Sequence, residues 1–180
     1  MIEFQEAFDI VTSMEFRTGS EIIHLTRSLN RVLSANVVSD MDLPPFDKAA
    51  VDGFACRKED LGNELEILET IPAGVWPSRK TGRNQCSRIM TGAPVPEGAD
   101  CVLMVEDTII NPSGKVRLTV PFSKKNIAFR GEDAKKGDVL LSSGRLISPQ
   151  DIAVMASAGY VNVEVSRKVR IGVARYNDHS

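Results

Sequence analysis

The amino-acid sequence predicts an α+β fold, in which a β-rich domain of barrel or sandwich type is inserted into a mixed α/β domain. Three observations support this prediction. Apolar residues near the N-terminal end recur at helical spacing, eight of the nine prolines and several short strand patterns lie between Leu43 and Pro121, and a strand–helix–strand pattern follows Gly137. The 180 residues suffice for one large domain or two small ones.

Two helices are predicted before residue 40. The first covers residues 2–14, where apolar side chains recur at intervals of three and four, at Phe4, Ala7, Phe8, Val11 and Met14. The second covers residues 26–33, with Thr26 as its N-cap and an apolar face of Leu29, Val32 and Leu33. His24 precedes this cap and is interpreted as a linker or core-edge residue rather than a metal ligand.

Short strands are predicted for the central part of the chain. Polar and apolar residues alternate over residues 64–67 and 116–120, and residues 101–105 form a short apolar run. The sequence Asn-Pro-Ser-Gly at residues 111–114 is typical of a hairpin turn. Short strands joined by such turns indicate a β-rich unit.

A strand–helix–strand pattern closes the chain. Residues 139–141 and 161–165 are predicted strands, and the helix between them covers residues 150–158, with Pro149 at its first position and Gly159 just past its end. A last strand is predicted from Val169 to Val173. Either its domain continues beyond this sequence, or the strand pairs with the β-rich unit.

Composition and charge exclude several functions. With 22 Lys+Arg against 24 Asp+Glu, the net charge of −2 argues against a surface for nucleic acid or anionic membranes. No apolar run approaches the length of a membrane span, and acidic residues stand where a signal peptide carries lysines. Three widely separated cysteines fit a reducing cytoplasm, and two histidines are too few for a histidine-based zinc site.

The first candidate site surrounds Asp52 and Gly53, which follow a proline-rich entry and form a tight turn. A carboxylate projected by such a turn can bind a cation or accept a proton. The alternative is an Asx-turn, in which the Asp52 side chain bonds only its own backbone.

The second candidate site is the turn at Thr91 and Gly92, where a predicted strand ends. Its backbone amides and the threonine hydroxyl are suited to an anion. The alternative is an ordinary turn at the end of a strand.

The third candidate site is the sequence Arg-Gly-Glu-Asp at residues 130–133. Its cation is suited to a phosphate and its two carboxylates to magnesium. The alternative is a charged surface turn.

Taken together and in this order, these motifs resemble the molybdopterin molybdenumtransferase family, which includes MoeA and the gephyrin E domain. The resemblance runs from Phe4 to Val173 and includes residues 25–33, 52–55, 89–95, 131–133 and 156–159, with Gly144 and Pro149. Each motif is weak alone, but several in register constrain one another.

The resemblance implies an enzyme that inserts molybdate into adenylylated molybdopterin and releases AMP with the help of Mg²⁺. It assigns catalytic roles to Asp52, Thr91 and Asp133, and substrate binding to Gly53, Gly92, Arg130, Gly131 and Glu132. Ala49 and Ala128 depart from the family pattern, which has serine and arginine at these positions.

The resemblance also implies a domain organisation and partners. Residues 1–46 and 139–168 would form an elongated first domain, residues 47–138 an inserted β-rich second domain, and residues 169–180 the start of a truncated α/β third domain. A cytoplasmic homodimer is implied, with a molybdopterin adenylyltransferase as a further partner. The alternative is a non-catalytic module for dimerisation or docking, because most of the third domain and all of the fourth are absent from the 180 residues.

Overall fold

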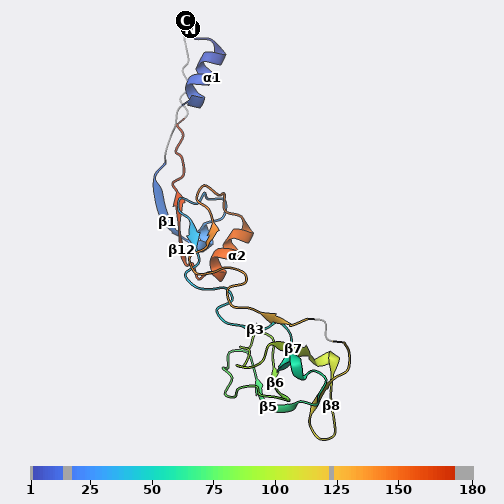
Figure 1. Cartoon of the computed structure of the whole chain (residues 1–180). Coiled ribbons are helices and arrows are strands. Elements are labelled where there is room, and N and C mark those ends of the chain that lie inside the picture. Colours follow the sequence, from blue (N-terminus) through green and yellow to red (C-terminus); the bar gives the residue numbers. More distant parts are fainter. Residues whose placement is uncertain (1, 14–17, 122–123, 173–180) are drawn as a thin grey trace. The chain divides into compact units, whose positions relative to one another are not determined.

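The computed structural model describes residues 2–13, 18–121 and 124–172, and Figure 1 shows the whole chain. The chain forms two compact units, the first made of Met1–Val38 and Val139–Ser180 and the second of Ser39–Asp138. The described residues are a mixture of many short strands and few helices, which confirms a mixed α/β fold. The finer assignment into elongated, barrel-like and truncated domains stays a prediction.

The first unit is built on two antiparallel strand pairs. Strand β1 (Ser20–His24) pairs with β12 (Asn162–Ser166), and β2 (Val37–Val38) pairs with β11 (Val139–Leu141). Helix α2 (Pro149–Ser157) closes a core whose buried members are Leu25, Leu33, Val37, Leu141, Ile147, Met155, Val163 and Val165. The strands predicted over residues 139–141 and 161–165 are therefore confirmed.

Helix α1 (Phe4–Ser13) confirms the first predicted helix, although Met14 lies outside the described residues. None of its residues is buried. The rings of Phe4 and Phe8 stack on one another with their centroids 6.1 Å apart, and Val11 extends the same exposed apolar face.

The second predicted helix is wrong. Residues 26–33 contain only the end of a short 3-10 helix, η1 (Leu25–Arg27), whose N-cap is His24 rather than Thr26. The chain turns at Asn30, where φ is 59°, and the Leu33 amide donates to the Arg145 carbonyl at 2.9 Å. Pairing with distant backbone therefore overrides the helical spacing of the apolar residues.

The last predicted strand is also wrong over its described residues. Residues 167–172 form no strand, and Val173 lies outside the described part of the chain. Over the described residues, the β1–β12 ladder ends at the pair Ser20 and Ser166, and just beyond it the Arg167 amide donates to the Gly19 carbonyl at 3.0 Å. Ile171 is 83% exposed accordingly.

Helix α2 confirms the third predicted helix and begins with a complete capping box. The Ser148 hydroxyl accepts the Asp151 amide, and the Asp151 carboxylate accepts the Ser148 amide at 2.9 Å. Arg145 donates to the same carboxylate at 2.9 Å. This guanidinium and the Ser148 amide lower the pKa of the buried Asp151 to about 2.

In the Asp151→Asn variant, the free energy of unfolding should depend less on pH at acidic pH than it does in wild type. Because folding lowers the pKa of Asp151 from 3.8 to about 2, its contribution is complete above pH 3.8 and disappears as the pH falls through 2. Urea unfolding measured from pH 3.8 down to pH 2 should show a smaller loss in the free energy of unfolding for the variant than for wild type. Glu164→Gln, an exposed change on β12, is the control, and coincident curves for wild type and Asp151→Asn would refute the role.

The second unit is centred on a four-stranded sheet in the order β5 (Glu66–Ile71), β6 (Gln85–Ile89), β4 (Gly53–Cys56) and β7 (Cys101–Met104). The β5–β6 pair is parallel, whereas β4 runs antiparallel to both of its neighbours. Buried side chains on the sheet include Phe54, Leu103 and Ile89.

Two smaller strand pairs complete this unit. Strands β8 (Thr108–Ile110) and β9 (Val116–Leu118) form the predicted hairpin, and the Gly114 amide donates to the Asn111 carbonyl in its turn. Strands β3 (Lys48–Ala49) and β10 (Ile127–Ala128) pair antiparallel. Short 3-10 helices, η2 (Lys58–Asp60) and η3 (Val105–Asp107), follow β4 and β7.

The three cysteines lie in one row across the sheet. Cys56 on β4 is directly opposite Cys86 on one side and Cys101 on the other, and all three are free and buried. The Cys101 thiol and burial raise the pKa of Cys56, and burial raises that of Cys86 to about 12. These thiols pack as small apolar groups. Within the described residues, no helix is long and apolar enough to cross a membrane.

Candidate functional site

Two predicted site residues, Asp52 and Thr91, meet at one end of the central sheet. Asp52 precedes β4, and Thr91 follows β6 after one residue. Because Gly53 pairs with Ile89 in this antiparallel ladder, the start of β4 lies beside the end of β6. Asp52 Oδ1 accepts the Thr91 amide at 2.7 Å and the Thr91 hydroxyl at 2.6 Å.

The two hydrogen bonds from Thr91 define the charge state of Asp52. The hydroxyl bond, followed by the amide bond, lowers the pKa of this carboxyl, and nearby Arg88 adds to the effect. The side chain therefore bonds across the sheet instead of forming an Asx-turn, and it is ionised at neutral pH. Among the described residues, nothing donates a hydrogen bond to Asp52 Oδ2, which leaves one oxygen for a ligand.

Asp52 and Arg88 line the same small pocket. Its volume is about 70 Å³, and its other lining residues are Gly53, Ile89, Met90 and Val105. Arg88 is an exposed residue of β6 that the sequence analysis did not select as a site residue. Arg88 lies between buried residues on a predicted strand, and this pattern indicates that its side chain points to solvent. The pattern does not reveal which carboxylate the side chain faces.

Replacing Thr91 with valine should raise the pKa of Asp52. The change removes the hydroxyl donor, which is the largest stabilising contact of the carboxylate, and retains the amide donor. A carboxyl-detected NMR titration measures the shift directly. Thr108→Val is the matched control, because the Thr108 hydroxyl donates to a backbone carbonyl, that of Val105. An Asp52 pKa equal in wild type and Thr91→Val would contradict this assignment.

The Arg130–Asp133 turn forms a second cluster in the same unit. The Arg130 amide donates to Asp47 Oδ1, and its guanidinium Nε donates to Asp42 Oδ2, each at 2.7 Å. The Gly131 amide donates to the Pro44 carbonyl at 2.9 Å, with φ of 69° at this glycine. These contacts fix the turn against residues 42–47.

The two acidic residues of this turn have different surroundings. The Glu132 carboxylate accepts the Phe129 amide at 2.8 Å, and the Asp133 amide donates to the Leu43 carbonyl at 2.9 Å. Both side chains are exposed. The amide of Lys136 and the guanidinium of Arg130 lower the pKa of Asp42, a partner that the sequence analysis missed.

The β3–β10 pair lies between the two clusters along the chain. The Gly92 amide donates to the Ala49 carbonyl at 2.8 Å, and Ala49 pairs with Ile127, three residues before Arg130. No hydrogen bond or ion pair between described residues joins Asp52 or Thr91 to the Arg130–Asp133 turn. The structure thus brings the predicted residues together as two groups, and their catalytic and binding roles stay predictions.

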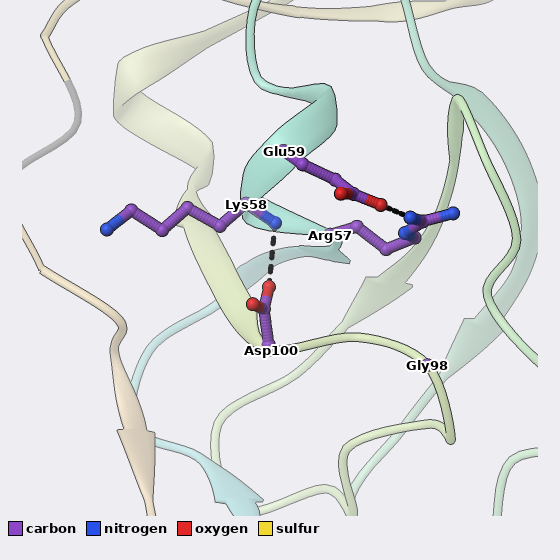
Figure 2. Close-up of a pocket in the computed structure, with 5 residues that line it drawn as sticks. All are labelled: Arg57, Lys58, Glu59, Gly98 and Asp100. Atoms are coloured by element: carbon purple, nitrogen blue, oxygen red, sulfur yellow. Dashed lines mark hydrogen bonds and ion pairs between the residues drawn. The ribbon is translucent and has the colours of Figure 1, made fainter.

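A larger pocket of about 580 Å³ lies elsewhere on this unit and contains none of the predicted site residues. Figure 2 shows Arg57 and Glu59 paired within it, while Asp100 accepts the Lys58 amide at 2.6 Å. Gly98 completes its lining. Oppositely charged side chains here bind one another, as on an ordinary solvated surface.

The described residues contain no group of three or more histidine, cysteine, aspartate or glutamate side chains placed to bind a metal ion. Mg²⁺ does not require such a cage, since it is often bound by one or two carboxylates together with substrate phosphates and water. Asp52, ionised and with one oxygen free of hydrogen bonds, fits the role of one such ligand.

Comparison with known proteins identifies similar sequences and structures. Residues 2–159 match the sequence model of the family described as "MoeA N-terminal region (domain I and II)". Proteins named molybdopterin molybdenumtransferase from Staphylococcus aureus and Staphylococcus epidermidis are each 36% identical over 96% of this chain, which corresponds to 43% of their own length. The chain therefore spans less than half the length of these relatives.

A solved structure is similar as well. The molybdopterin biosynthesis moeA protein from Pyrococcus horikoshii OT3 superimposes with a TM-score of 0.82 and 33% sequence identity. The match covers 92% of this chain and 46% of the archaeal one. Sequence and structure comparisons thus agree on the same region of the same kind of protein.

Proposed function

Because the chain belongs to the family of MoeA N-terminal regions, which comprise domains I and II, we propose that it supplies one wall of a site for inserting molybdate into adenylylated molybdopterin. AMP is the leaving product. One observation carries this proposal: Thr91 fixes an ionised Asp52 in a small pocket beside Arg88, with one carboxylate oxygen left for a ligand.

The chemistry of the substrate fits this arrangement. Adenylylated molybdopterin is multiply anionic, so a carboxylate alone would repel it, but a carboxylate that binds Mg²⁺ would not. A bound Mg²⁺ would neutralise phosphate charge as the phosphoanhydride bond breaks. Asp52 would contribute one ligand, Thr91 would hold Asp52 in place, and the exposed Arg88 would face the anion.

The second cluster has a binding role in this proposal. Arg130 would contact a phosphate, while Gly131 and Glu132 fix the turn on which it lies. The exposed Asp133 would act at the catalytic site. Gly92 would allow substrate to approach the backbone, since it has φ of 83° and open space where a Cβ would lie. Gly53 would contribute indirectly, because the Leu103 carbonyl fills the space where its Cβ would lie and so brings β7 close to β4 beside Asp52.

The rest of the site would come from chain beyond these domains. We propose a cytoplasmic homodimer in which domain II faces the third domain of the partner subunit, with a molybdopterin adenylyltransferase as the source of substrate. Three free, buried cysteines are consistent with a reducing compartment. A second candidate function is a non-catalytic dimerisation or docking module, which the exposed apolar face of α1, formed by Phe4, Phe8 and Val11, favours.

A chimera separates the two candidates. Residues 1–168 of this chain would replace the matching part of the Staphylococcus aureus relative, and AMP release from adenylylated molybdopterin would be measured. We expect activity from the chimera and none from the 180-residue chain alone. A folded, dimeric but inactive chimera would favour the docking module, whereas AMP release by the chain alone would contradict a shared site.

A further inference from the structure

An aromatic pair, the half-buried Phe46 and the exposed Trp76, lies on the second unit. Their ring centroids are 5.0 Å apart and the ring planes are inclined at 59°. Trp76 is 68% exposed despite this contact, so much of its ring surface faces solvent. Tryptophan is highly buried on average, and an exposed one with a fixed neighbour is typical of a binding surface.

The loop that carries Trp76 is fixed by a single glutamate. Glu69, on β5, accepts the Ser78 amide at 3.1 Å and the Arg79 amide at 3.0 Å. On the other side of Trp76, the Val75 amide donates to the Pro72 carbonyl at 3.2 Å. The backbone that carries the indole is therefore fixed on both sides of Trp76, which limits the entropy that a ligand must remove.

The backbone of Arg130 is bonded to the segment that carries Phe46. Phe46 is followed directly by Asp47, whose carboxylate accepts the Arg130 amide at 2.7 Å. The Arg130 side chain is 66% exposed, and its Nε donates to Asp42. Among the described residues its terminal nitrogens make no hydrogen bond, so they can donate to a ligand. An aromatic surface and an exposed guanidinium on segments bonded to one another suit a planar heterocycle attached to a phosphate.

We propose that Phe46 and Trp76 form a stacking platform for the planar nitrogen heterocycle of a phosphorylated ligand, with Arg130 contacting the phosphate. The inference rests on the proposed function, because adenylylated molybdopterin contains two such heterocycles, adenine and pterin. It assigns the aromatic pair to substrate positioning, a role that the sequence analysis gave to neither residue.

Tryptophan fluorescence tests the platform without any turnover. Trp76 is the only tryptophan of the 180 residues, so its emission reports on this site alone. The chain would be titrated with AMP, with pterin-6-carboxylate and with ribose 5-phosphate. We expect AMP, the pterin or both to quench saturably, and ribose 5-phosphate to leave the emission unchanged. The ligand that quenches identifies which heterocycle stacks.

Variants separate stacking from nonspecific quenching. Phe46→Ala keeps the fluorophore and should raise the Kd of the quenching ligand roughly 5- to 150-fold, the range for one lost stacking contact. Trp76→Phe should retain binding by equilibrium dialysis, and Trp76→Ala should lose it. Arg130→Gln should weaken AMP but not adenosine. Val75→Ala, an exposed apolar neighbour in the same loop, is the matched control.

The proposal fails if wild type gives no saturable quenching with either heterocycle, or if Phe46→Ala and Trp76→Ala bind as wild type does. Its failure is distinguishable from failure of the proposed function. An active chimera without heterocycle binding at Trp76 would reject the platform alone. An inactive chimera whose Trp76 is still quenched by AMP would reject the insertase role and keep the platform.

Discussion

Replacing Gly53 with alanine is expected to unfold the second unit of the protein. A Cβ at this position would overlap the carbonyl oxygen of Leu103 on the neighbouring strand and lie 2.8 Å from its carbonyl carbon. Both Leu103 atoms belong to the backbone of β7, which pairs directly with β4, so they cannot move aside without breaking the β4–β7 ladder. We expect a loss of about 4 kcal/mol or more in the free energy of unfolding.

Denaturant unfolding and hydrogen exchange measure this loss. The control is Gly62→Ala, because Gly62 lies in a turn of the same unit with no atom near its Cβ position and no positive φ. That variant should stay within about 0.5 kcal/mol of wild type. Wild-type stability in Gly53→Ala would mean that the two strands are farther apart in solution than in this structure.

Replacing Asp52 with asparagine is expected to lower the rate of AMP release by about 100-fold or more, as is usual when a catalytic carboxylate loses its charge. The measurement uses the chimera with the Staphylococcus aureus C-terminal part. Asparagine keeps a side-chain oxygen that accepts both hydrogen bonds from Thr91, so the fold and the thermal midpoint should change little.

The comparison of rate with stability decides the role of Asp52. Glu66→Gln, an exposed carboxylate-to-amide change on β5 of the same sheet, should leave both quantities unchanged. If Asp52→Asn lost stability and activity in the same proportion, the carboxylate would be structural. Increasing Mg²⁺ should partly restore the rate of Asp52→Asn if this residue contributes one of several ligands.

Local signals in the sequence predicted some elements well. Helix α2 was predicted because Ser148, Pro149 and Gly159 encode its start and stop within a few residues. The helix expected over residues 26–33 had equally good spacing but was wrong, because backbone groups such as the Leu33 amide bond distant carbonyls instead. The spacing of apolar residues cannot show that backbone groups more than 100 positions away compete for the hydrogen bonds of a helix.

The candidate site shows the same limit. Asp52 and Thr91 were each identified from turn chemistry, yet their hydrogen bond spans 39 residues and depends on the register of β4 against β6. Only the family resemblance indicated that they act together. Asp42 and Asp47 were not selected, since nothing in the local sequence shows that Arg130 binds both.

The chain leaves and re-enters the first unit at two adjacent points, and this closeness determines whether the second unit can be removed or transferred. Val38 and Val139 are paired on β2 and β11, and the Tyr160 hydroxyl bonds both the amide and the carbonyl of Val38 at 2.9 Å. Likewise, the Ser39 amide donates to the Asp138 carbonyl at 2.9 Å. The second unit is therefore inserted into the first like the loop of a hairpin between β2 and β11, and closing this loop costs little further entropy. Residues 39–138 can accordingly be moved between proteins as one segment. If they are replaced by a tight turn that joins β2 to β11, the first unit should still fold.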